Sequence, residues 1–184
     1  MSVSERTAAI APWRADQRTA ERDEQTLGLA GAAEIRSLLT KARTVAMVGL
    51  SADALRPSYF VAVYLQAVGY TVYPVNPRYA GETILGRPVF ASLRDIPDHI
   101  DIVDIFRRPA DVPGVVDEAA AIGAGAVWMQ LTVINEDGAR RARAAGMTVV
   151  MDRCMKVEHG RHLGQMHALG FTTGIISARR KPQQ

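Results

Sequence analysis

The stretch Thr44-Val45-Ala46-Met47-Val48-Gly49-Leu50-Ser51 decides the fold of this chain. It is a continuous apolar run that stops at a glycine, which is typical of a strand buried on both faces of a sheet. Before the run, apolar residues within 32–39 fall at helical spacing. After it, residues 57–68 form an amphipathic stretch that begins with proline and is followed by Gly69, the usual punctuation of a helix. Helix, strand and helix therefore follow one another.

The same alternation continues toward the carboxyl end of the chain. Further β-rich runs occupy residues 70–75, 100–106, 126–131 and 147–151. Helical patterns at 111–121 and 135–145 separate the later runs. Strands that alternate with helices at this spacing predict a single α/β domain, a Rossmann-like doubly wound parallel sheet with helices on both faces.

Length and composition predict one globular domain with polar ends. The chain has 184 residues, of which 48% are hydrophobic and 22% charged, so it can bury a sizeable core. We expect a flexible arm at 1–26, the domain at 27–159 and an extension at 160–184. The single Cys154 and the charged amino-terminal residues predict a cytoplasmic protein without a membrane span.

The charge pattern argues against nucleic acid as a partner. The net charge is +3, but basic residues in the two polar ends supply much of it, and no element carries a basic cluster with interleaved aromatics. His159, His162 and His167 lie close in sequence, yet their spacing places at most two on one helical face. We therefore expect no metal site.

Arginines follow three of the predicted strands. Ligands of open parallel sheets bind at the carboxyl ends of the strands, near the point where the strand order reverses. Four guanidinium groups at that edge favour a polyanion, because guanidinium groups suit phosphate oxygens. The residues that leave the strand ends are Gly49, Ser51, Arg56, Asn76, Arg78, Arg107, Arg108 and Gln130.

The turn at 49–51 resembles part of a glycine-rich phosphate turn. Ser51 and Ala54 stand where a dinucleotide fingerprint has its second and third glycines, and the second strand ends in Asn76 rather than an acid. These departures disfavour NAD in its usual pose. Arg78 is suited to a ribose phosphate, which fits NADP as well as coenzyme A.

The order of the motifs resembles the small CoA-binding proteins, whose fold matches the amino-terminal domain of the succinate-CoA ligase α subunit. The resemblance runs from about Ala42 to His159. It rests on Val45–Ser51 of the opening stretch and on five further blocks, Arg56-Pro57-Ser58-Tyr59, Tyr73-Pro74-Val75-Asn76-Pro77-Arg78, Val103-Asp104-Ile105-Phe106-Arg107-Arg108-Pro109, Trp128-Met129-Gln130 and Met151-Asp152-Arg153-Cys154.

This resemblance implies a binding site for CoA or an acyl-CoA. The diphosphate region would be held by the turn and the start of the following helix, and the adenosine with its phosphate would lie along the second strand's end. The fourteen residues that it implies are Gly49, Leu50, Ser51, Arg56, Pro57, Ser58, Val75, Asn76, Pro77, Arg78, Phe106, Arg107, Arg108 and Gln130.

The resemblance also implies that the protein is not an enzyme, since the ligases use further domains that a chain of this length does not accommodate. A nucleophilic Cys154 with His159 as its base is conceivable, but the pair has no evident third member. The alternative function is that of an NADP-linked oxidoreductase that uses the same crevice. A third possibility is an interaction protein with a relic pocket, because no residue compels turnover; the sequence leaves the protein partner unknown.

Overall fold

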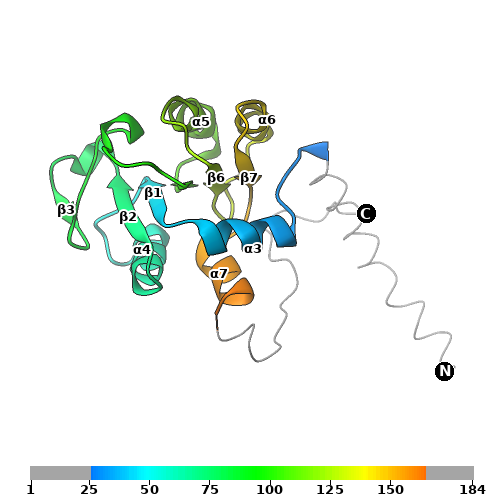
Figure 1. Cartoon of the computed structure of the whole chain (residues 1–184). Helices are drawn as coiled ribbons and strands as arrows, with labels where there is room; N and C mark the ends of the chain where they lie inside the picture. The colour runs from blue at the N-terminus through cyan, green and yellow to red at the C-terminus, as the bar shows by residue number, and fades with distance from the viewer. Residues whose placement is uncertain (1–25, 165–184) are drawn as a thin grey trace, which may run out of the picture.

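Five parallel strands form the central sheet of the computed structural model, which describes residues 26–164 (Figure 1). The sheet has the order β2-β1-β5-β6-β7, which confirms the predicted doubly wound arrangement. Most of the expected arm and of the expected extension lie outside the described residues. The strands are β1 (Thr44–Val48), β2 (Thr71–Val75), β5 (Ile102–Ile105), β6 (Ala126–Met129) and β7 (Thr148–Val150).

Helices cover both faces of this sheet, as Figure 1 shows. One face carries α3 (Ala32–Lys41), α4 (Pro57–Ala67) and α7 (Met155–His162), and the other carries α5 (Val112–Ala121) and α6 (Glu136–Ala144). The helix ends follow their sequence signals. Proline occupies the first turn of α4, and the Asn135 side chain accepts a hydrogen bond from the amide of Gly138 at the start of α6.

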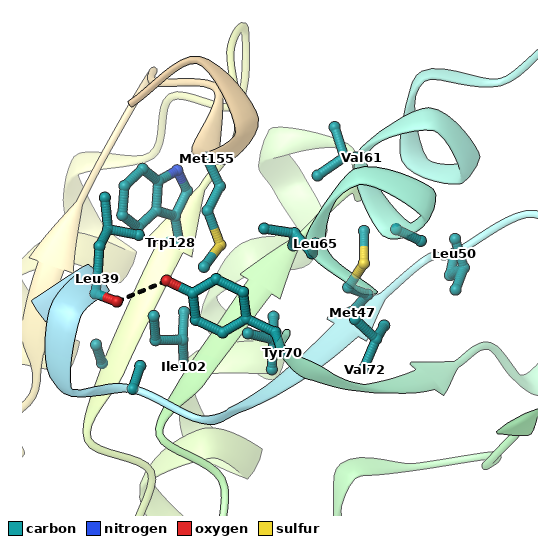
Figure 2. Packing of buried hydrophobic residues seen from close by; sticks show 14 of the residues in the cluster. Leu39, Met47, Leu50, Val61, Leu65, Tyr70, Val72, Ile102, Trp128 and Met155 are labelled. Atoms are coloured by element: carbon teal, nitrogen blue, oxygen red, sulfur yellow. Dashed lines mark hydrogen bonds between the residues drawn. The ribbon is translucent and has the colours of Figure 1, made fainter. Parts of the chain in front are cut away.

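A separate hydrophobic layer lies under each set of helices. Beneath α3, α4 and α7, side chains from β1, β5 and β6 pack around Trp128, which is fully buried (Figure 2). The indole nitrogen donates a hydrogen bond to the carbonyl of Arg153. Tyr70 crosses the same layer and donates its hydroxyl to the carbonyl oxygen of Leu39 at 2.6 Å, which ties α3 to the start of β2.

Two parts of the structure were not predicted as elements. A small hairpin of β3 (Thr83–Ile84) and β4 (Arg87–Pro88) follows β2. Helix α7 crosses residue 159, where we expected the domain to end. Its Glu158 is buried but pairs with Arg161 at 2.8 Å, so a charged helix is accommodated against the core.

The strand order reverses between β1 and β5. From β1 the chain passes through α4 to β2 on one side, whereas β5 leads through α5 to β6 on the other. Val48, the last residue of β1, is paired with Val75 of β2 and with Ile105 of β5. Three strand ends therefore meet at one place on the sheet, which is where an open α/β sheet positions a ligand.

Candidate functional site

Gly49 forms the floor of the candidate site. Its amide donates a hydrogen bond to Val75, and the amide of Phe106 donates to Val48 at 2.9 Å, so the exits of β2, β1 and β5 are joined here. The backbone of Gly49 has φ +90°, and a Cβ at this position would overlap the carbonyl oxygen of Phe106. Glycine is therefore required both by conformation and by the close approach of β5.

The turn between Gly49 and α4 is held by its own side chains. The Ser58 hydroxyl accepts a hydrogen bond from the Ser51 amide at 3.2 Å, and the Ser51 hydroxyl accepts from the Asp53 amide at 3.1 Å. Arg56 precedes the helix and pairs with Asp53 at 3.5 Å, with both side chains exposed. The turn thus presents a cation and two hydroxyl groups beside the glycine.

At the end of β2, Asn76 fastens the two turns together. The side-chain nitrogen of Asn76 donates a hydrogen bond to the carbonyl oxygen of Leu50 at 2.9 Å, and its side-chain oxygen accepts one from the backbone amide of Arg78 at 3.1 Å. The Arg78 guanidinium lies over the ring of Tyr79, 5.6 Å from its centroid. Asn76 therefore shapes the site, while Arg78 offers a charge at its edge.

Past β5, one carboxylate pairs with two arginines. Asp111 lies 3.2 Å from Arg107 and 3.2 Å from Arg108. The hydrogen bond from Arg108 is the main reason that the pKa of Asp111 lies below its usual value. Asp111 therefore remains ionised at neutral pH.

These strand ends enclose an open cavity of about 720 Å³. Three arginines and one aspartate contribute to its wall, so the cavity carries a positive charge. Ten of the fourteen predicted residues line it, whereas Asp53 and Tyr79 were not predicted. The lining residues are Gly49, Ser51, Asp53, Arg56, Pro57, Ser58, Asn76, Pro77, Arg78, Tyr79, Phe106 and Arg107.

The other four predicted residues lie outside this lining. The Leu50 side chain is buried in the core, and Val75 is buried beside a second cavity. Arg108 points to solvent with 82% of its side chain exposed. Gln130 is buried, and its amide nitrogen lies 2.9 and 3.0 Å from the two carboxyl oxygens of Asp104. A ligand contact by any of the fourteen residues stays a prediction.

Asp104 is a buried acid in the centre of the sheet. It is paired in register with Met47 of β1 and Trp128 of β6 and has no exposed surface. Burial raises the pKa of Asp104 to about 8, while the hydrogen bond from Gln130 opposes that rise. The sequence signal for this placement is the position of Asp104 within an otherwise apolar strand.

A second cavity, of about 410 Å³, lies on the α5 side of Arg107. Its walls combine apolar side chains with the carboxylates of Asp111 and Glu118. Sequence reasoning missed it because half of its wall comes from α5 and the connection before β5 rather than from strand ends. The lining residues are Val48, Gly49, Val75, Pro77, Ala91, Ser92, Leu93, Arg107, Ala110, Asp111, Gly114, Val115 and Glu118.

His159 packs against tyrosines. Its Nδ1 lies 2.9 Å from the hydroxyl of Tyr64, its ring meets Tyr70 edge to face, and burial lowers its pKa. Within residues 26–164, no three His, Cys, Asp or Glu side chains gather in a way that could hold a metal ion. None of the helices in that range has the length and apolar character needed to cross a membrane.

Comparison with known families identifies the family of this chain. The family described as "CoA binding domain" matches residues 43–160, which include β1 through most of α7. The chain belongs to this CoA-binding family. The resemblance inferred from the separated motifs is thereby confirmed.

Two relatives match most of the chain. The YneT protein of Bacillus subtilis (strain 168), described as uncharacterized, is 39% identical over 127 residues, which are 69% of this chain and 93% of YneT. The structure of a hypothetical protein from Pyrococcus horikoshii OT3 has a TM-score of 0.71 and 41% identity, and the match covers 73% of this chain and 94% of the other.

A larger enzyme contains a related segment. The ADP-forming acetate–CoA ligase II of Archaeoglobus fulgidus is 29% identical over 102 residues. This match covers 54% of the present chain but 15% of the ligase. This chain is therefore similar to a small part of that ligase.

Proposed function

We propose that this protein binds CoA or an acyl-CoA in the 720 Å³ cavity and catalyses no reaction of its own. The observation that carries the proposal is the meeting of Arg56, Arg78 and Arg107 around Gly49 at the switch point of a CoA-binding fold. Guanidinium groups form paired, charge-assisted hydrogen bonds with phosphates. CoA supplies a diphosphate and a ribose phosphate.

The cavity offers different chemistry to the parts of this ligand. The turn at Gly49 and Ser51, together with Arg56 and Ser58, would bind the diphosphate, because backbone can approach closely where no Cβ intervenes. Arg78 would meet the ribose phosphate beside the end of β2. Phe106 and Arg107 would contact the ligand further along the crevice.

We propose the absence of catalysis because the polar groups that line the cavity already have hydrogen-bond or ion-pair partners. The hydroxyls of Ser51 and Ser58 accept hydrogen bonds from the backbone of the turn, and the Asn76 side chain links two turns. Asp53, the one acid in the lining, is exposed and paired with Arg56. These groups are engaged in shaping the site.

Thermal unfolding and calorimetric titration with CoA, acetyl-CoA, NADP and NAD test the proposal. A ligand that binds the folded state alone stabilises it by RT ln(1 + [L]/Kd), so CoA should raise the unfolding temperature far more than NAD does. Arg56→Ala should reduce the CoA shift, whereas Arg140→Ala, on the exposed face of α6, should not. Equal shifts with NADP and CoA would remove the preference for CoA.

A further inference from the structure

Arg107 stands at the boundary between the two cavities. Gly49, Pro77 and Arg107 contribute to the walls of both. Of these three, Arg107 alone has a long side chain, and a Cβ added to Gly49 would lie 3.0 Å from its Cδ. The Arg107 side chain therefore lies against Gly49, in the wall that the two cavities share.

The two cavities differ in charge. Arg56 and Arg78 make the first one cationic, whereas Asp111 and Glu118 lie in the wall of the second. The Glu118 carboxylate accepts hydrogen bonds from the Ser92 hydroxyl at 3.0 Å and from a backbone amide. Carboxylates repel phosphate, so the second cavity suits an uncharged group that donates hydrogen bonds and packs on apolar side chains.

Asp111 restrains Arg107 on the side of the second cavity. The two side chains are 3.2 Å apart, and 39% of the Arg107 side chain is exposed. Arg108 donates to both carboxyl oxygens of Asp111, at 3.3 and 3.2 Å. When Arg107 leaves Asp111, Arg108 remains as the partner of Asp111, so the carboxylate is not left unpaired.

We propose that Asp111 competes with the ligand for Arg107. A phosphate in the first cavity takes the guanidinium from Asp111, and this movement opens the second cavity to an uncharged part of the same ligand. Asp111 thereby makes occupation of the second cavity depend on a phosphate in the first. The competition itself needs only an anion, whereas the coupling between the cavities rests on the proposed function.

Inorganic pyrophosphate probes the competition directly, by calorimetric titration of the full chain. Asp111→Asn keeps the shape of the side chain and removes the charge, so pyrophosphate should bind about two- to fivefold more tightly. Arg107→Gln should weaken binding, and Asp111→Asn should have no effect in that background. Weaker binding by Asp111→Asn alone, or additive effects of the two changes, would overturn the proposal.

Asp117→Asn is the matched control for net charge. Asp117 lies in α5, the helix that directly follows Asp111, but it is 3.4 Å from Arg141 of α6 and lines neither cavity. The change adds the same charge to the protein as Asp111→Asn. We expect it to leave the affinity for pyrophosphate nearly unchanged; an equal gain would attribute the effect to long-range electrostatics and overturn the role of Asp111.

Gly114→Leu tests the second cavity. Gly114 lines that cavity from α5, and a Cβ added there meets no atom within 4 Å. The helix therefore tolerates leucine, and the leucine side chain occupies volume in the second cavity. CoA should bind at least about tenfold more weakly while pyrophosphate binds as before. Ala120→Leu, exposed on the same helix and outside both cavities, should leave both affinities unchanged.

The outcomes separate this inference from the proposed function. Unchanged CoA affinity in Gly114→Leu would show that the ligand does not enter the second cavity, although CoA binding itself would stand. Failure of the unmodified protein to bind CoA would overturn the proposed function. The pyrophosphate titrations would still decide whether Asp111 competes for Arg107.

Discussion

Arg78 is the residue that should distinguish CoA from dephospho-CoA, which lacks the ribose phosphate. Its guanidinium lies at the edge of the cationic cavity and stacks on Tyr79. If it meets that phosphate, the protein should prefer CoA by about 1–2 kcal/mol, since a hydrogen bond to a charged group contributes ~1.5–3 before solvent screening. Arg78→Ala should lose most of this preference in calorimetric titrations with both ligands.

Salt and a control substitution sharpen the Arg78 prediction. An exposed phosphate contact is screened, so added salt should narrow the preference of the unmodified protein. Arg140→Ala removes an equal charge from α6 and should leave the preference intact. Equal weakening of both ligands by Arg78→Ala would instead assign the arginine to the diphosphate or to the shape of the cavity.

Asp104 should make stability depend on pH. Burial raises its pKa to about 8, whereas an aspartate in the unfolded chain titrates near about 3.9. Asp104 contributes fully to the free energy of unfolding at pH values below its pKa in the unfolded chain. This contribution is lost as the pH rises toward its pKa in the folded protein, because the folded state holds a proton that the unfolded state releases. Asp104→Asn should therefore flatten the decline of the unfolding free energy between pH 5 and 8.

Denaturant titrations at several pH values measure this effect. One coupled proton changes the unfolding free energy by up to about 1.4 kcal/mol per pH unit, which is the largest difference in slope expected between the two proteins. Asp117→Asn, at an exposed position, should retain the slope of the unmodified protein. An identical slope in Asp104→Asn would mean that Asp104 is ionised in the folded state.

The sequence predicts the position of some side chains at the site better than that of others. Residues placed directly by the backbone at strand ends, such as Gly49, Asn76 and Arg107, could be predicted because parallel strands end at one edge. Gln130 also follows a strand end, but it turns to Asp104 in the core. Rotamer choice depends on partners distant in the sequence, so spacing alone does not reveal it.

At the scale of elements, the β1 turn depends on Gly49. Gly49→Ala should destabilise the protein more than Gly69→Ala does, although the two glycines have similar backbone angles, φ +90° at Gly49 and φ +99° at Gly69. A left-handed backbone costs a residue with Cβ about 1–2 kcal/mol, and this is the whole cost at Gly69, where a Cβ meets nothing within 4 Å. At Gly49 the overlap with Phe106 adds to it.

Guanidinium-induced unfolding of the two variants gives the difference directly. The excess destabilisation of Gly49→Ala measures how closely β5 passes the turn. Loss of the CoA-induced thermal shift in Gly49→Ala, with the shift retained in Gly69→Ala, is the expected companion result. Equal destabilisation by the two substitutions would contradict the close approach.

Helices and strands with strong periodicity were predictable, whereas α7 was not. Strands such as β1 are buried on both faces, and their continuous apolar runs identify them. Helix α7 buries Glu158, which Arg161 and Arg153 neutralise at 2.8 and 3.7 Å. Because α7 has paired charges in place of an apolar stripe, its sequence shows no helical pattern of hydrophobic residues. The formation of α7 therefore depends on tertiary contacts.

On the scale of the whole molecule, we expect no ligase activity. The related ADP-forming ligase is matched over 15% of its length, so its remaining parts have no counterpart in this match. Purified protein incubated with acetate, CoA and ATP should form no acetyl-CoA above the rate without protein, measured by chromatography of the thioester. Turnover that disappears with Arg56→Ala would show that the cavity supports catalysis.

The joining of three strand ends at Gly49 has a kinetic consequence. The amide of Gly49 joins the end of β1 to β2, and the amide of Phe106 joins β5 to the end of β1, which is remote from it in sequence, so a partly folded chain that lacks β5 does not retain the whole cavity floor. These amides should exchange with solvent through global unfolding. A ligand bound at the proposed site would stabilise the folded state, and each tenfold rise in its free concentration above Kd would add about 1.4 kcal/mol to the free energy of the opening that precedes proteolysis. Under the proposed function, the resistance of the protein to proteolysis would therefore rise with the supply of CoA.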